Sequence, residues 1–276
     1  MNYLYKITAI IQFGYYLTGI CYKHCFVNRS NPAISISNKN GFSLLVFKAF
    51  YIWSLHYSKM NEKIISESPF FSVIIATFNR KATIIRAINS LIAQTETDWE
   101  AIIVDDGSTD NTYFEIRGLL EKHRNIKYVK QKNKGAAASK NRGIQHAKGL
   151  FFTFLDSDDE YECSHLASRK NILLGNPELK FLSGGIKIIG SPYVPNRFNI
   201  SEQIHLDKCE IGGTFFIEKE ILYSLKGFND ILLGEDADLY DRVLKMSVPM
   251  LKTELPTYIY HRETEGSVTN LLLTIS

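Results

Sequence analysis

The sequence has few cysteines: Cys21 and Cys25 have a metal-like spacing, but the other two are widely scattered. Its 276 residues include four cysteines, at positions 21, 25, 163 and 209, and no two of them form a C-x-x-C pair. Scattered cysteines in a chain of this length are typical of a reducing compartment. We therefore expect no structural zinc site, and we expect a cytoplasmic protein.

The N-terminal region also lacks a convincing secretory signal or membrane-spanning helix. Residues 3–22 are nearly long enough to cross a bilayer, but the stretch is rich in tyrosine and Lys6 and Gln12 interrupt its apolar character. A second apolar run, residues 42–57, is shorter and contains Lys48. We predict that both runs form helices that do not span a membrane.

Charge is unevenly distributed along the chain. Residues 1–68 contain seven Lys and Arg residues and two acids, while the whole chain has a net charge of +3, so the remainder is slightly acidic. A basic, aromatic segment suits contact with an anionic surface. We predict a helical N-terminal extension over residues 1–68. Residues 1–57 either contact the cytoplasmic face of a membrane peripherally or pack on the body as an extra layer.

From residue 69 onward, short apolar runs alternate with longer helical stretches. Strands are predicted at 71–76, 100–104, 126–131 and 150–155, and helices at 81–94, 111–123 and 136–147. Strands of this length alternating with helices indicate βαβ units and a parallel sheet, so the fold class is α/β. No G-x-G-x-x-G follows the first strand, which excludes a dinucleotide-dependent oxidoreductase.

The second half of this domain is less regular. We predict helices at 163–174, 219–225 and 237–246, strands at 181–189 and 213–217, and a loop rich in Pro and Asn at 190–199. The domain then divides into a half over residues 69–160 that binds one substrate and a half over residues 161–270 that binds an acceptor.

Polar side chains follow the predicted strands at the points where the strands end. Thr77 and Asn79 follow the first strand, Asp105 and Asp106 the second, and the sequence D-S-D-D of residues 156–159 the fourth. Ligands of parallel α/β sheets bind at these carboxyl ends. Each motif alone also fits a polar turn or a helix N-cap.

The aspartates of the third motif have the chemistry of a divalent-metal site. Asp156 and Asp158 lie two residues apart at a strand end and can face the same cleft. Hard oxygen ligands suit Mg²⁺ or Mn²⁺, and a cation relieves the repulsion among neighbouring carboxylates. The alternative is a solvated acidic loop.

Together these segments resemble glycosyltransferase family 2, whose fold is called GT-A, a Rossmann-like, mainly parallel mixed sheet flanked by helices. The resemblance spans residues 69–270 and includes T-F-N at 77–79, D-D-G-S at 105–108, N-K-G at 133–135, S-K-N-R-G at 139–143 and D-S-D at 156–158. Ser-Lys stands where the family has Ala-Arg, which keeps the charge but removes a bidentate contact. The donor-binding residues implied by the resemblance are Thr77, Phe78, Asn79, Asp106, Gly135, Lys140, Asn141, Asp156 and Ser157.

The resemblance also implies a metal ion, Mn²⁺ or Mg²⁺. Its ligands would be Asp158 and His261, with Asp156 binding directly or through water. The histidine belongs to the sequence Y-H-R at 260–262, which resembles a C-terminal stretch of the family. A lone histidine also fits a structural role.

The second half supplies the residues expected to act on the acceptor. G-E-D at 234–236 resembles the family's E-D motif, so Asp236 is implied as the general base and Glu235 as a supporting residue. Gly213 and Ser267 lie in further segments similar to the family's acceptor side. The acids of this motif also fit helix capping.

The activity implied by the resemblance is an inverting transfer from a nucleotide-diphosphate sugar, with UDP-sugars expected, to a hydroxyl of a glycan or lipid-linked glycan in surface polysaccharide biosynthesis. Two alternatives remain open at this point. One is a non-catalytic module that binds nucleotide-sugars or glycans. The other is a nucleotidyltransferase, although residues 76–80 do not form the Gly-rich, basic triphosphate loop that such an enzyme needs. No nucleic-acid partner is expected.

Overall fold

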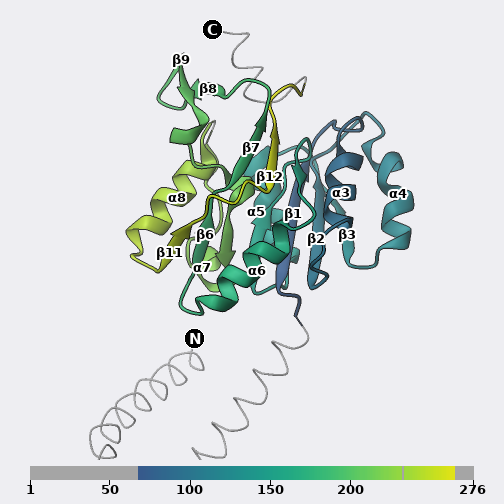
Figure 1. Ribbon diagram of the computed structural model, residues 1–276. Helices are drawn as coiled ribbons and strands as arrows, with labels where there is room; N and C mark the ends of the chain where they lie inside the picture. The colour runs from purple at the N-terminus through teal and green to yellow at the C-terminus, as the bar shows by residue number, and fades with distance from the viewer. Residues whose placement is uncertain (1–67, 232, 265–276) are drawn as a thin grey trace, which may run out of the picture. The chain divides into compact units, whose positions relative to one another are not determined.

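The computed structural model describes residues 68–231 and 233–264 (Figure 1). The predictions made for the N-terminal extension, for its membrane contact through residues 1–57 and for Ser267 lie outside these residues. Within the described part of the chain, no helix combines the length and apolar character needed to cross a membrane.

The core of the domain is a seven-stranded mixed sheet with the order β11-β6-β10-β4-β1-β2-β3. Four neighbouring strands of this sheet run parallel: β1 (Phe71–Thr77), β2 (Trp99–Asp105), β3 (Ile126–Lys130) and β4 (Phe151–Phe154). All four were predicted as strands. They are recognisable in the sequence because both faces of the sheet are covered, so every position along β2 is buried.

Helices cover both faces of this sheet (Figure 1). They are α3 (Ile84–Ile92), α4 (Thr112–Lys122), α5 (Ala136–His146), α6 (His165–Gly175), α7 (Lys219–Ser224) and α8 (Glu235–Lys245). Helices α3, α4 and α6 pack with Val73 and Ile75 of β1 on one face. Helices α5, α7 and α8 pack with Ile74 on the other. Successive residues of a strand point to opposite faces, which explains this division.

The acceptor half extends the sheet with short strands: β6 (Phe181–Ser183), β10 (Phe216–Glu218) and β11 (Met250–Lys252). β10 runs antiparallel to β4 and β6. The strand predicted at 181–189 is wrong as a single element. The chain turns at Gly184 and Gly185, with φ of 90° and 81°, and continues as β7 (Ile186–Ile189) in another sheet.

That second sheet has the order β5-β12-β7, with β5 (Glu160–Tyr161) and β12 (Tyr258–His261). The loop predicted at 190–199 is also wrong. It contains β8 (Tyr193–Asn196) and leads into β9 (Asn199–His205), and the two pair as an antiparallel hairpin. Pro195 is tolerated because this ribbon has only two strands and a register shift beside the proline. Two short 3₁₀ turns follow, η1 (Leu206–Lys208) and η2 (Gly212–Thr214).

Candidate active site

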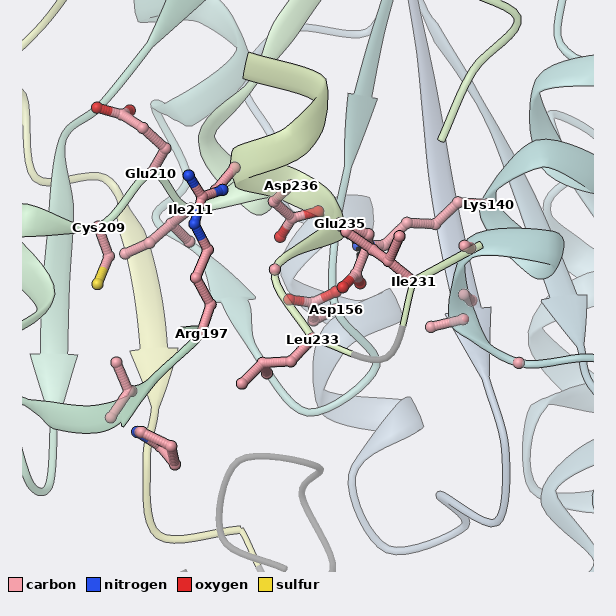
Figure 2. Close-up of a pocket in the computed structure, with 18 of the residues that line it drawn as sticks. Lys140, Asp156, Arg197, Cys209, Glu210, Ile211, Ile231, Leu233, Glu235 and Asp236 are labelled. Atoms are coloured by element: carbon pink, nitrogen blue, oxygen red, sulfur yellow. Dashed lines mark hydrogen bonds and ion pairs between the residues drawn. The ribbon is translucent and has the colours of Figure 1, made fainter. Parts of the chain in front are cut away.

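A cavity of about 1280 Å³ lies beyond the carboxyl ends of β1 and β4. Its walls come from the start of α5, the β8–β9 hairpin and the N-terminus of α8. Figure 2 shows Lys140, Asp156, Glu235 and Asp236 gathered on one side of it. The predicted site residues that line the cavity are Thr77, Phe78, Asn79, Asp106, Gly135, Lys140, Asp156, Ser157, Asp158, Glu235, Asp236 and His261.

The first donor turn follows β1 and is held by the turn after β2. The backbone N–H of Asn79 donates to Ser108 Oγ at 2.9 Å, and Asn79 Oδ1 accepts from the Thr109 N–H at 2.9 Å. These bonds support the left-handed backbone of Asn79, whose φ is 53°. Phe78 is left 43% exposed in the cavity wall, and the buried hydroxyl of Thr77 has no hydrogen-bond partner within the described residues. The turn therefore presents an aromatic ring to the cavity, with an unsatisfied hydroxyl buried beneath it.

Asp106 anchors the start of α5. Its carboxylate accepts from Gln131 Nε2 at 2.8 Å and from the backbone N–H groups of Lys134 and Gly135 at 2.9 and 2.7 Å. Gly135 has a φ of 89°. Through these bonds Asp106 orients the turn formed by residues 133–135. Asp106 also lines the cavity, and its contact with the donor remains a prediction.

The three aspartates after β4 have different surroundings. Burial raises the pKa of Asp156, repulsion from Asp158 and Glu235 adds to the shift, and Lys140 opposes it. Burial also raises the pKa of Asp158, whose Oδ2 lies 3.8 Å from Arg80 Nε. Two crowded, partly desolvated carboxylates facing one cavity fit the oxygen ligands of a divalent cation.

Asp159 serves the fold instead. It is fully buried, and its oxygens accept from the Tyr258 hydroxyl at 2.7 Å and from the His261 N–H at 2.8 Å. Burial, followed by repulsion from Asp156 and Asp158, raises its pKa well above the ordinary value. Asp159 thus fastens β12 beside the aspartate turn.

The structure gives His261 a protein partner. His261 Nε2 lies 2.6 Å from Glu160 Oε1, and Glu160 also lies 3.5 Å from Arg86 Nε. Across residues 68–231 and 233–264, no three His, Cys, Asp or Glu side chains are grouped closely enough to hold a metal ion. His261 as a metal ligand therefore remains a prediction.

Asp236 lies in the first turn of α8, where the positive end of the helix dipole favours a carboxylate. Its Oδ1 accepts from Lys140 Nζ at 2.9 Å and its Oδ2 from the Gly212 N–H at 3.0 Å. A Cβ on Gly212 would stand 2.3 Å from Asp236 Cγ, so only glycine leaves room for this carboxylate. The two donors hold it in one orientation toward the cavity.

Lys140 is almost completely buried, with 5% of its surface exposed. Its ammonium group also donates to Glu235 Oε1 at 3.2 Å and lies 4.9 Å from the centre of the Phe228 ring. Burial lowers the pKa of Lys140, but Asp236, Glu235 and Asp156 overcome that effect and raise it above the ordinary value. The lysine is therefore a fixed cation amid three carboxylates.

Two predicted residues do not line the cavity. Asn141 exchanges two hydrogen bonds of 2.8 Å with the backbone of Phe228. Gly213 packs under Tyr258, whose ring atom Cζ would lie 2.2 Å from a Cβ at that position. Sequence reasoning did not identify Gly212, Asp159 and Tyr258 as supports of the site. The first two stand beside predicted residues, whereas nothing local marks Tyr258.

Comparisons with known proteins agree with this geometry. The family model described as glycosyl transferase family 2 matches residues 72–173. A UDP-Glc:alpha-D-GlcNAc-diphosphoundecaprenol beta-1,3-glucosyltransferase, WfgD of Escherichia coli, is 31% identical over 145 residues, which cover 51% of this chain and 56% of the relative. A GalNAc(5)-diNAcBac-PP-undecaprenol beta-1,3-glucosyltransferase of Campylobacter jejuni is 30% identical, covering 64% of this chain and 60% of the relative.

Solved structures share the fold. TarS of S. aureus, residues 1–349 in complex with UDP-GlcNAc, aligns with a TM-score of 0.59 and 22% identity over 72% of this chain and 60% of that one. The mannosyltransferase PcManGT from Pyrobaculum calidifontis, in complex with GDP-Man and Mn²⁺, aligns with a TM-score of 0.58 and 19% identity over 81% of this chain and 68% of that one.

The expected fold is thereby confirmed as a GT-A fold. The chain spans between 56% and 60% of the length of the two curated relatives. The sequence match, the fold and the motif order agree, and residues 72–173 match glycosyltransferase family 2.

Proposed function

We propose that the protein is an inverting glycosyltransferase that moves a sugar from a nucleotide-diphosphate sugar, expected to be a UDP-sugar, to a hydroxyl of a lipid-linked glycan. The observation that carries the proposal is that Asp236 and Asp156 lie close together on one side of a single cavity, which Asp158 also lines. A carboxylate base and a site for the leaving diphosphate are the two functions that a single displacement requires.

The donor would bind on the side of β1 and β4. The exposed Phe78 ring would stack on the nucleoside, and Asp156 and Asp158 would hold Mn²⁺ or Mg²⁺. When bound, this ion would neutralise charge on the leaving diphosphate. Support comes from the two crowded carboxylates and from the GDP-Man and Mn²⁺ in the structure of PcManGT.

The acceptor would enter between the β8–β9 hairpin and α8. As its hydroxyl oxygen forms the new bond to the anomeric carbon, Asp236 takes the hydroxyl proton, and the bond to the diphosphate breaks on the opposite face. Both oxygens of Asp236 already accept one hydrogen bond each, yet each keeps a further lone pair for this proton. No covalent intermediate is needed.

The relatives suggest the class of acceptor. Two of them carry names with undecaprenol-linked diphosphate sugars as acceptors. We extend this class to the present chain and assign it to surface polysaccharide assembly at the cytoplasmic face of the membrane, with residues 1–57 in peripheral contact.

The test is a transfer assay over a panel of nucleotide-sugars, with Mn²⁺ and short diphosphate-lipid acceptors, comparing the parental protein with Asp236→Asn. The variant keeps its shape and should bind the donor as before, because a base that acts in the transition state adds little to ground-state affinity. Transfer should fall by about 10²-fold or more. Glu235→Gln is the matched control and should have a milder effect.

Two results would redirect the proposal. Donor binding without transfer to any acceptor would favour a non-catalytic binding module. Release of pyrophosphate from a nucleoside triphosphate in the presence of a sugar phosphate would favour a nucleotidyltransferase.

A further inference from the structure

The buried ammonium group of Lys140 has a geometry that a phosphate-binding lysine would not need. A lysine that meets a ligand phosphate usually keeps its charged end accessible, because the ammonium group is strongly hydrated. Lys140 is instead 5% exposed, and two carboxylates and one aromatic ring surround its nitrogen. Two of its three N–H groups already donate to Glu235 and Asp236, and its side chain is only 6% exposed, so a donor phosphate would have to compete with these carboxylates.

The surroundings of Lys140 connect the two halves of the domain. The lysine belongs to α5, which packs on the parallel strands, while Glu235 and Asp236 begin α8. The next residue, Asn141, binds the backbone of Phe228 through both atoms of its amide. One turn of α5 thus fixes both the acidic start of α8 and the loop before it.

The contact also completes the orientation of the Asp236 carboxylate. Lys140 holds Oδ1 at 2.9 Å, and the Gly212 N–H holds Oδ2 at 3.0 Å from a different element. Without the lysine, Asp236 would keep the hydrogen bond from Gly212, and it would lose the cation that offsets its repulsion with Glu235. A general base that rotates away from the acceptor hydroxyl loses rate, because catalysis depends on alignment within a fraction of an ångström.

We propose that Lys140 is a positioning residue for Asp236 and does not bind the donor phosphates. The inference rests on the proposed function and revises the donor-binding role that the resemblance gives to this lysine. It predicts that the effect of Lys140 on transfer passes entirely through the Asp236 carboxylate.

A double-mutant cycle tests this prediction with Lys140→Met, Asp236→Asn and the double variant. Lys140→Met should lower kcat by about tenfold or more at saturating substrates. It should change the donor Kd, measured by calorimetry, by less than about threefold. In the Asp236→Asn background the same change should alter kcat by less than about threefold, because there is no base left to position.

Two further variants guard against a general loss of structure. Lys140→Arg retains a cation and should recover part of kcat, and it replaces Lys140→Met in the cycle if the methionine variant does not fold. Lys148→Met changes an exposed lysine just after α5 and should leave kcat unchanged.

Other outcomes separate the two hypotheses. A donor Kd weakened by more than about tenfold in Lys140→Met would overturn the inference. So would a double variant whose loss of kcat equals the product of the losses in Lys140→Met and Asp236→Asn. A parental protein that transfers no sugar contradicts the proposed function itself. A parental protein that transfers sugar while the cycle is multiplicative contradicts only the role of Lys140.

Discussion

The donor half and the acceptor half of the domain position their functional side chains by different means. In the donor half, Thr77 ends β1, Asp106 directly follows β2 and Asp156 lies two residues after β4, so the sheet itself brings them to one edge. In the acceptor half, Asp236 depends on single contacts from Lys140 and Gly212. One half relies on a regular ladder of backbone hydrogen bonds, and the other on a few side chains that bind loops.

This difference has a consequence for mutation. A residue at a strand end is held by many neighbours, so replacing its side chain removes chemistry and little else. A residue held by one or two contacts can be displaced by a change in its neighbour. The predictions below probe each half separately, beginning with the largest expected effect.

Removing divalent metal should disable the donor half. With EDTA, transfer should fall by several orders of magnitude, on the scale of the several kcal/mol of charge stabilisation that a metal supplies, and it should return with Mn²⁺ or Mg²⁺. Asp158→Ala should lose the response to added metal, whereas Glu115→Ala, on the exposed side of α4, should keep it. Full donor affinity in chelator, measured by calorimetry, would contradict the assignment of Asp156 and Asp158.

Gly212→Ala should disable the acceptor half without changing the donor half. The new Cβ would occupy the place of the Asp236 carboxylate, which must swing away. We expect kcat to fall by about tenfold or more, with the donor Kd and the melting temperature nearly unchanged. Gly175→Ala is the matched control, because a Cβ there meets nothing within 4 Å. If Gly212→Ala kept the parental kcat, the close approach of Gly212 would not determine the orientation of the Asp236 carboxylate.

Asn141→Ala should weaken the link between the halves. The substitution removes two hydrogen bonds and leaves the Phe228 N–H and C=O without their partner, which should lower the free energy of unfolding by about 1–3 kcal/mol. Urea unfolding measures this change, and Asn89→Ala, at an exposed position of α3, should cost far less. An unaltered unfolding midpoint would mean that the loop is held by other contacts.

The smallest effect concerns pH and the buried His165, which stacks on Tyr161. Burial, helped by the charge of Arg169, lowers the pKa of His165 well below its ordinary value. The folded protein therefore keeps this imidazole neutral, and the stability it contributes is complete above the unfolded pKa and falls as the pH drops below it. Between pH 6.5 and 5.5 the loss should be about 1 kcal/mol.

Unfolding in urea at both pH values checks this expectation. His165→Gln should show a shallower dependence on pH than the parental protein, because the group that takes up a proton on unfolding is gone. If the free energy of unfolding changed equally with pH in the two proteins, the prediction would be contradicted. Buried carboxyls such as Asp159 contribute with the opposite sign in both proteins, so their contribution cancels in the comparison.

The contrast between the halves also explains what could be predicted from the sequence. The strands β1 to β4 are apolar runs between helices, and polar residues stand at their ends, so these strands and the residues that line the cavity could be predicted without a structure. The Asp236 position was found through the motif G-E-D. The lysine at position 140 was found as well, but its buried contacts with Glu235 and Asp236 were not, because they join residues 95 and 96 positions apart.

The errors fall in the acceptor half for a physical reason. β6 and β7 are short and follow each other closely, so a single apolar run spans two sheets that part at Gly184 and Gly185. The β8–β9 hairpin was predicted as a loop because Pro195 lies within β8, and proline is uncommon in strands. Such elements are defined by what they pair with, which no local pattern records.

The attachment of β12 determines the order in which parts of this protein can fold during synthesis. Asp159 finds its partners, the Tyr258 hydroxyl and the His261 N–H, 99 and 102 residues further along the chain. A ribosome therefore completes the parallel strands long before the residues that secure the aspartate turn have been synthesised. The emerging chain therefore contains β1 to β4 before the aspartate turn is secured, and that turn can take its final form only after β12 has docked.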